Sequence, residues 1–295
     1  MQTPPFTQRV LAATGLALAI FSAHATTLVG LTSSNEIARF DTANIGAATR
    51  TAITGLDAGD RFVGIDLRPG DNRIYGITLS NRLYTVNEFT GATSFVAALS
   101  ASIVNPTLGY GIDFNPVADF SGAASLRFVS SAGGTFAINA NTGVVGNTAN
   151  TIASGFSGVA YSNSNPLPGS APISTSLYYI DSTNDTLSVA TTAFNTPTIT
   201  TVGSLGVDVL RANGFEILGN GQAFATLNVD AGSSLTTGLY GINLATGAAS
   251  LLGTFNGTLS GLTLSVSAVP EPGSYGLMGA GLLAVVALAR RRRPA

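Results

Sequence analysis

The sequence predicts an all-β protein, a five-bladed β-propeller that is closed by strands from both ends of the chain. Gly, Ser, Thr, Asn and Ala dominate between β-branched and aromatic residues, which is typical of short strands and tight turns. A glycine followed by an apolar–any–apolar triplet recurs at spacings of 47, 47, 56 and 47 residues, at Gly64, Gly111, Gly158, Gly214 and Gly261. A period of this length indicates propeller blades.

Each period predicts four strands, and the repeated glycine opens the first of them. Second strands are expected at residues 73–79, 126–130, 177–181 and 223–228. Third strands are expected at 83–87, 135–139 and 239–243, each before a Thr-Gly pair that supplies the positive-φ position of a hairpin turn. Fourth strands are expected at 94–99, 144–152, 198–202 and 249–255.

The two ends of the repeat region are out of phase with it. Residues 27–31, 37–41 and 50–53 look like strands two to four of a blade without a first strand, and residues 261–266 are a first strand without successors. Joining them completes the fifth blade and removes exposed sheet edges. The polar segment 163–172 reads as an inserted loop that lengthens one interval. A β-sandwich and a seven-bladed ring are the alternatives.

The N-terminus is typical of a secretory signal peptide over residues 1–25. Arg9 precedes an apolar run from Val10 to Phe21, and Ala23 and Ala25 form a small–any–small cleavage site. Cleavage there leaves a mature domain that begins at residue 26. The alternative is a retained N-terminal anchor, which the shortness of the apolar run disfavours.

The C-terminus combines a short motif, an apolar segment and a basic cluster. Residues 273–289 carry no charge and are just long enough to cross a bilayer as a helix. The motif before them is Pro270-Glu271-Pro272, and the cluster after them is expected to stay cytoplasmic. That cluster is Arg290, Arg291, Arg292 and Arg293. An ordinary C-terminal anchor with an accidental Pro-Glu-Pro is the alternative.

This tail, residues 269–295, resembles the PEP-CTERM sorting signal of Gram-negative bacteria. The resemblance implies that an exosortase, a membrane transpeptidase, recognises Pro270, Glu271 and Pro272. The repeat region from Leu28 to Ser265, within a predicted domain at 26–268, resembles an uncharacterised bacterial domain that often accompanies this tail. The matching stretches are 28–31, 63–69, 74–76, 83–91, 203–208 and 239–247. That resemblance implies a propeller-like fold and no assigned activity.

The missing residue types exclude several chemistries. The chain has no Cys, Trp or Lys, and its one histidine, His24, is expected to leave with the signal peptide. The mature domain therefore lacks the base of Ser–His–Asp or Cys–His systems, and it lacks His-ligated zinc and Schiff-base lysines. Without the two ends it retains 8 arginines and 14 acidic residues. A net charge of about −6 does not favour nucleic-acid binding.

Carboxylates remain as candidates for chemistry. Asp66, Asp113 and Glu216 occupy the same position in three of the five first strands, which are expected to line a central channel. Converging acids suit a glycosidase acid/base pair or a Ca²⁺ site. The alternative is that this position satisfies backbone groups between blades, since Ala160 and Thr263 occupy it in the other two. A further group in loops, Asp57, Asp60 and Asp71, reads as solvated turn acids rather than a cation site.

These observations favour an exported, non-enzymatic protein that serves a structural or carbohydrate-binding role. The expected route is an inner-membrane anchored precursor, cut by signal peptidase and an exosortase, then release to the cell surface or a biofilm matrix. Exopolysaccharide is the expected partner, with no cofactor. The alternatives are a secreted carbohydrate-active enzyme that uses the channel carboxylates, and a periplasmic scaffold whose tail is never cut.

Overall fold

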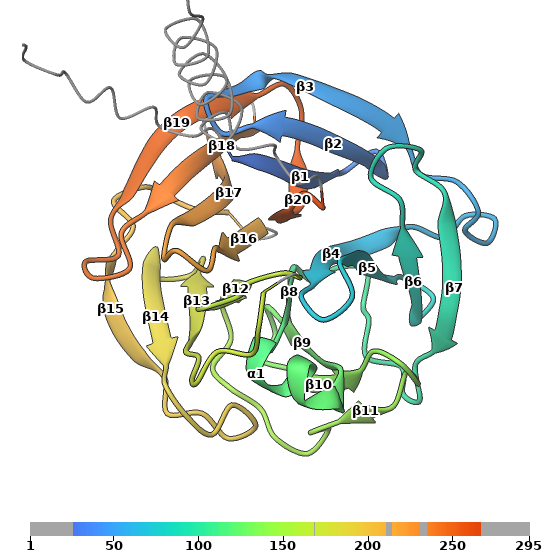
Figure 1. Cartoon of the computed structure of the whole chain (residues 1–295). Helices are drawn as coiled ribbons and strands as arrows, with labels where there is room; N and C mark the ends of the chain where they lie inside the picture. The colour runs from blue at the N-terminus through green and yellow to red at the C-terminus, as the bar shows by residue number, and fades with distance from the viewer. Residues whose placement is uncertain (1–25, 168, 211–213, 231–234, 267–295) are drawn as a thin grey trace, which may run out of the picture.

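A computed structural model, which describes residues 26–167, 169–210, 214–230 and 235–266, confirms the five-bladed β-propeller. The described residues form five antiparallel sheets of four strands around one axis (Figure 1). Blade 1 contains β4 (Phe62–Arg68), β5 (Arg73–Thr78), β6 (Arg82–Val86) and β7 (Thr93–Ala98). Blade 2 contains β8 (Tyr110–Phe114), β9 (Ser125–Ser130), β10 (Thr135–Asn139) and β11 (Val145–Gly146).

The other three blades complete the ring. Blade 3 contains β12 (Phe156–Tyr161), β13 (Leu177–Asp181), β14 (Thr186–Ala190) and β15 (Thr200–Ser204). Blade 4 contains β16 (Gly214–Ile217), β17 (Ala223–Asp230), β18 (Leu235–Ile242) and β19 (Ala249–Phe255). Blade 5 contains β20 (Leu259–Leu264), β1 (Thr27–Thr32), β2 (Glu36–Asp41) and β3 (Asn44–Ala52).

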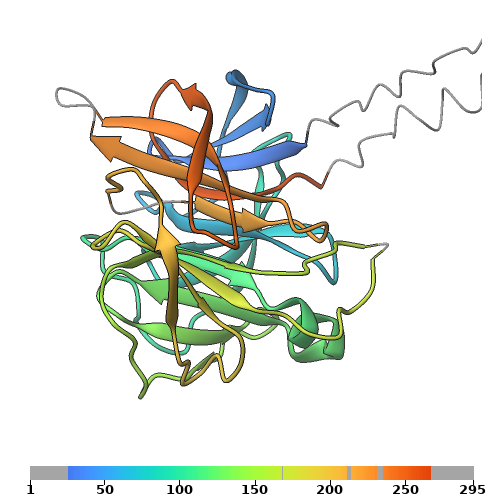
Figure 2. The same cartoon turned by 90° about the vertical axis from the view of Figure 1, so that its left-hand side faces the viewer.

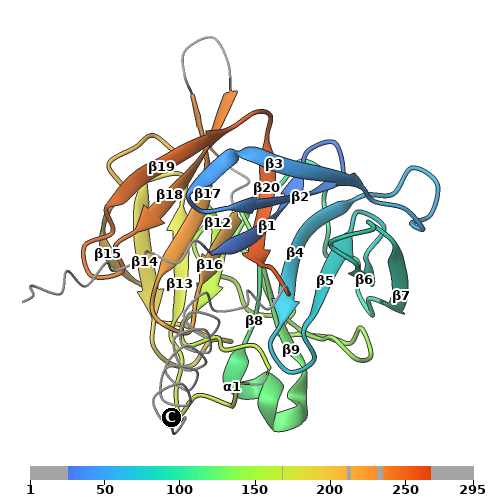
Figure 3. The ribbon, with the colours of Figure 1, turned by 45° about the horizontal axis from the view of Figure 1, so that its top comes forward.

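Blade 5 shows the predicted closure. Figure 3 shows β20 beside β1, and the two strands pair antiparallel with Val29 opposite Thr263 and Gly30 opposite Leu262. The start of β1 and the end of β20 lie on the face of the ring that also carries the short helix α1 (Pro116–Ala118), as Figure 2 shows. Both ends of the described chain therefore leave the propeller on one face.

The Thr-Gly turns also connect neighbouring blades. At Gly91 the backbone has φ +70°, its carbonyl accepts a hydrogen bond from Thr54 N at 2.9 Å, and a Cβ there would lie 2.0 Å from Ala52 O. Gly143 repeats this arrangement with a hydrogen bond from Ser100 N at 3.0 Å. Only glycine combines this φ with such close approach to the preceding blade. The repeated turn thus fixes the blades to one another.

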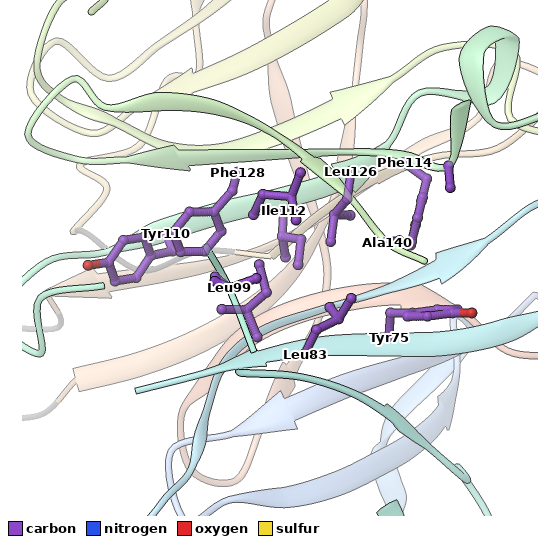
Figure 4. Close-up of a cluster of buried hydrophobic side chains, with 12 residues drawn as sticks. Tyr75, Leu83, Leu99, Tyr110, Ile112, Phe114, Leu126, Phe128 and Ala140 are labelled. Carbon is purple, nitrogen blue, oxygen red and sulfur yellow. The ribbon is translucent and has the colours of Figure 1, made fainter. Parts of the chain in front are cut away.

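The core lies between blades rather than inside one sheet. In Figure 4, Tyr75 and Leu83 of blade 1 face Ile112, Phe114 and Leu126 of blade 2. Leu83 and Leu126 are fully buried. Burial of a side chain of this kind contributes roughly 1.5–3 kcal/mol. The free energy of folding therefore depends on the blades closing into a ring.

Several local features differ from the sequence-based expectation. The fourth strand of blade 2, β11, has two residues instead of the stretch 144–152, because Asn147 has φ +62° and ends the strand. β14 supplies the expected third strand of blade 3, and β3 begins at Asn44 instead of residue 50. The helical segment α1 with the following η1 (Asp119–Ala123) was also missed. Asn115 caps it by accepting a hydrogen bond from Ala118 N at 3.0 Å.

The inserted loop is present between β12 and β13. The predicted signal peptide at 1–25 and the predicted transmembrane segment at 273–289 lie outside the described residues. Within the described ranges, none of the helices has the length and apolar character needed to cross a bilayer.

Candidate functional site

Three carboxyl groups meet at the centre of the ring. Asp66 on β4, Asp113 on β8 and Glu216 on β16 hold equivalent positions in the innermost strands, so their side chains converge as the sequence predicts. One carboxylate oxygen from each lies within 4.8 Å of the others, and the residues are only 3%, 2% and 4% exposed. The structure thus brings all three predicted residues into one buried cluster.

Each carboxylate in this cluster accepts a hydrogen bond from the backbone of the next blade in the cyclic order 1–2–3–4–5–1. Thr263 continues the same pattern from blade 5 to blade 1, since its hydroxyl accepts from Leu67 N at 2.8 Å. The three carboxylate bonds are Phe114 N to Asp66 Oδ2 at 2.8 Å, Tyr161 N to Asp113 Oδ1 at 3.0 Å and Leu264 N to Glu216 Oε2 at 3.1 Å. Four side chains therefore satisfy backbone groups between blades.

One blade departs from this pattern. In β12 the equivalent residue is Ala160, which has no side-chain acceptor for the backbone of β16. Glu216 itself interacts with the backbone of Ile217, and this hydrogen bond lowers the pKa of Glu216. The Glu216 carboxylate thus interacts with the backbone of its own strand as well as with Leu264 N of β20.

Burial is the main electrostatic influence on the cluster. It raises the pKa of Glu216 to about 7, against an ordinary value of 4.5. Burial, followed by the charge of Glu216, raises the pKa of Asp66 well above its usual range. The pKa of Asp113 is also raised, by burial and then by Asp66 and Glu216. The cluster therefore favours protonated carboxyl groups at neutral pH.

Thr263 gives independent evidence for a bound proton. Its hydroxyl oxygen lies 2.9 Å from Asp66 Oδ1 and 3.1 Å from Glu216 Oε2, and it already accepts the hydrogen bond from Leu67 N. A hydroxyl has one proton, so it donates to only one of these two carboxyl groups at a time. The other satisfies the contact by donating its own proton to Thr263.

These contacts fit Ca²⁺ poorly. The ion takes six to eight oxygen ligands. Both oxygens of Asp66 are already engaged, one by Phe114 N and the other by Thr263. Backbone N–H groups that point at the oxygens also repel a cation. The residues present therefore suit shared protons better than a metal ion.

This geometry predicts that calcium does not stabilise the propeller. Because a cation would have to displace the protons and the N–H donors, we expect the melting temperature to be the same in 5 mM CaCl₂ as in 5 mM EDTA. Differential scanning fluorimetry of the purified protein measures it. A clear rise with calcium that Asp113→Asn abolishes would contradict this interpretation.

A cavity between the first strands is too small for a sugar. It is bordered by first-strand residues that include Ile65, Ile112, Phe215 and Leu262, and its volume is about 10 Å³. That is about one water molecule. The two carboxyl groups of a glycosidase lie about 5–9.5 Å apart, and the substrate must fit between or beside them. A cavity of about 10 Å³ holds no sugar ring.

The three loop acids Asp57, Asp60 and Asp71 do not form one cluster. Asp57 pairs with Arg82, and Asp60 Oδ1 accepts hydrogen bonds from Arg61 N and Ser80 N. These two precede β4, whereas Asp71 follows it and accepts a hydrogen bond from Tyr75 Oη at 2.7 Å. Opposite ends of one strand separate them.

A second buried acid, Glu88, holds the end of the described chain. Its carboxylate accepts hydrogen bonds from Ser265 Oγ at 2.6 Å, Val266 N at 2.8 Å and Arg39 Nε at 2.7 Å, and the residue is 1% exposed. The segment after β20 is thereby fixed to blade 1. Sequence reasoning missed Glu88 because only the closed ring places it beside β20. The proposed sorting residues from Pro270 onward lie outside the described residues.

Comparison with known proteins identifies both parts of the chain. The sequence model of a domain of unknown function, DUF4394, matches residues 36–263. The chain belongs to the DUF4394 family. A PEP-CTERM protein-sorting motif matches residues 268–293, directly after the described end of this DUF4394 domain. Both resemblances are confirmed, and the motif indicates export and processing by an exosortase.

No curated protein matches this DUF4394 chain. Similar solved structures include the calcium-binding protein regucalcin from Agrobacterium tumefaciens (12% identity, 76% of this chain and 68% of that chain, TM-score 0.40). Others are a Bacteroides thetaiotaomicron protein of unknown function (13%, 81% and 60%, TM-score 0.47) and the GH74 xyloglucanase from Xanthomonas campestris (16%, 78% and 36%, TM-score 0.42). At these identities and TM-scores, the similarities support no statement about the ligands or activity of this chain.

Proposed function

We propose that this DUF4394 protein is a non-enzymatic component of the cell surface or extracellular matrix of a Gram-negative bacterium, with a structural or carbohydrate-binding role. The observation that carries the proposal is the sorting motif at residues 268–293, which follows a closed propeller. Such a tail delivers the domain before it, and a propeller that is closed by strands from both ends of the chain suits delivery to an exposed location.

The centre of the ring supports a non-enzymatic role. Its three carboxyl groups are buried and hydrogen-bonded to the backbone, and the cavity between the first strands has a volume of only about 10 Å³. A secreted carbohydrate-active enzyme that uses these residues is the alternative. It needs access for a glycan to groups that instead hold neighbouring blades together. Nothing in their geometry favours turnover over structural support.

Processing of the tail gives a direct test. In a Gram-negative host that carries an exosortase, we expect the wild-type chain to lose the Arg290–Arg293 end, and the double variant Pro270→Ala/Pro272→Ala to keep it, because the motif is the recognised element. Intact mass spectrometry of the purified protein and fractionation of the cells measure this. Pro294→Ala is the matched control, since it changes a proline of the same tail outside the motif.

The outcomes of this test separate the hypotheses. A processed wild-type chain in the surface or matrix fraction supports the proposal. A wild-type chain that keeps its whole tail supports a membrane-anchored periplasmic scaffold and overturns it. Processing of the double variant to the same extent as Pro294→Ala would show that Pro270 and Pro272 are not the recognised residues.

Binding and turnover are tested together on exopolysaccharide from the producing cells. We expect the protein to be retained on the immobilised polysaccharide without shortening the chains, as measured by size-exclusion chromatography. Shortening that Asp66→Asn abolishes, in a variant that still folds, would establish the enzymatic alternative.

A further inference from the structure

Arg127, in the middle of β9, is a buried arginine that the central cluster does not explain. It is 3% exposed, and it lies directly opposite Asp113 across the β8–β9 pair. Among the described residues its guanidinium hydrogen-bonds to neutral groups: Tyr161 Oη at 3.4 Å, Thr135 Oγ1 at 3.4 Å and Asn195 Oδ1 at 2.9 Å. Only the last of these is a hydrogen bond of ordinary length.

A counter-ion for Arg127 is missing from the described part of the chain. Arg39, Arg50, Arg68 and Arg82 all form ion pairs with acids, whereas Arg127 forms none within those residues. Asp113 accepts from Tyr161 N within the central cluster, where burial raises its pKa and favours the neutral form. A buried charge without a partner is costly, so this position favours an anion from outside.

Two buried tyrosines next to Arg127 leave its positive charge unbalanced. Tyr161 and Tyr179 are both fully buried, and the hydroxyl of Tyr179 has no hydrogen-bond partner among the described residues. Burial raises the pKa of both phenols, and the smaller opposing effect of Arg127 does not offset it. The two hydroxyls therefore stay protonated and add no negative charge near the guanidinium.

A cavity of about 300 Å³ leads to Arg127 from the surface. Its walls come from the segment after β8, from β9 and from the loop between β14 and β15. Besides the arginine, polar and aromatic side chains border it: Asn115, Ser125, Phe194, Asn195 and Thr196. The volume lies at the lower end of ligand sites, enough for about one sugar ring.

We propose that this cavity binds the carboxylate of an acidic sugar, a uronate unit of an exopolysaccharide, with Arg127 as the anion partner. This inference deepens the proposed carbohydrate-binding role and rests on it. The guanidinium has five N–H donors, of which its protein contacts use three, and the remaining two match a carboxylate. Amides and hydroxyls around it suit the sugar hydroxyls, and Phe194 offers an apolar face.

The test uses the full chain purified in detergent, with glucuronate, glucose and inorganic phosphate as separate probes in isothermal titration calorimetry. We expect glucuronate to bind, glucose not to bind, and phosphate to bind more weakly than glucuronate. Absence of glucuronate binding would overturn the proposal. Phosphate binding as tight as glucuronate binding would overturn the assignment to a uronate.

The variant Asn195→Asp tests the role of Arg127 without removing it. Asn195 Oδ1 already accepts from Arg127 Nη2, so an aspartate there supplies the missing counter-ion from within the chain. We expect glucuronate binding to weaken at least about tenfold and the melting temperature to rise. Asn220→Asp, the same change in an exposed turn between β16 and β17, is the matched control and should alter neither.

These results also distinguish the uronate site at Arg127 from the broader proposal of a surface or matrix protein. Glucuronate binding of equal strength in Asn195→Asp and Asn220→Asp would overturn the site, whatever the protein's location. Correct sorting and retention on polysaccharide without a response to Asn195→Asp would leave the proposed function standing and place the binding elsewhere.

Discussion

Gly214→Ala is expected to destabilise the propeller by about 3 kcal/mol and to lower its melting temperature by roughly 6–12 °C. A Cβ at Gly214 would lie 2.4 Å from both Leu262 N and Leu262 Cβ, and 2.5 Å from Gly261 C. These atoms belong to β20, the innermost strand of the next blade. Backbone cannot move aside as a flexible side chain does, so the clash must separate blades 4 and 5. Equilibrium unfolding in guanidinium chloride measures the loss.

Gly158→Ala is the matched control for this prediction. Gly158 holds the same place in the repeat, but an added Cβ would meet only side chains, at 3.4–3.5 Å. Such distances are ordinary contacts, so we expect a change below about 1 kcal/mol. Equal effects of the two substitutions would show that the repeated glycine is not required by close approach of the innermost strands.

The repeated glycine allows close approach of neighbouring innermost strands, and the sequence revealed its spacing but not where it is required. The spacing of Gly64, Gly111, Gly158, Gly214 and Gly261 predicted the number of blades and the closure, because one innermost strand per period must pack against the next. The space available for a Cβ differs from one of these glycines to another, however. It depends on the distance between two particular strands, which a periodic pattern does not encode.

The central cluster was predictable for a related reason. Residues in equivalent positions of equivalent strands must converge on the axis, so the sequence alone placed Asp66, Asp113 and Glu216 together. Their burial and proton sharing were not predictable. Both follow from Thr263, which the pattern marked only as a substitute for an acid, and from the narrow cavity between the first strands.

Contacts between blades account for most of what sequence reasoning missed. Glu88 and Arg127 interact with residues far away along the chain, such as Val266 and Asn195. A charged residue between apolar ones, as in Leu126-Arg127-Phe128, was the only available signal. The helical segment α1 depends on one local cap at Asn115, and the repeat of the strands gives no sign of it.

The buried carboxyl groups predict that the propeller becomes less stable as the pH rises from about 5 to 8. Glu216 has an ordinary pKa of 4.5 in the unfolded chain and a pKa of about 7 in the folded one. Between these values the folded state binds more protons than the unfolded state, so the free energy of unfolding falls with increasing pH. The stabilisation is complete below about pH 4.5 and is lost as the pH passes through 7.

The size of this effect follows from the same shift. A rise from 4.5 to about 7 corresponds to on the order of 3 kcal/mol for Glu216. Asp66 and Asp113 shift in the same direction, because burial raises the pKa of each. The three groups therefore act together, and urea unfolding at pH 5, 6, 7 and 8 should show a steady decrease in the free energy of unfolding.

Glu216→Gln isolates the contribution of this cluster from that of other acids on the protein. Glutamine keeps an oxygen that can accept from Leu264 N, but it cannot ionise. The variant should therefore be more stable than the wild type at pH 8, with the difference disappearing or reversing at pH 5. Because exposed acids titrate alike in both proteins, curves that stay parallel over this pH range would mean that Glu216 carries its charge in the folded state, and the proton-sharing arrangement around Thr263 would be wrong.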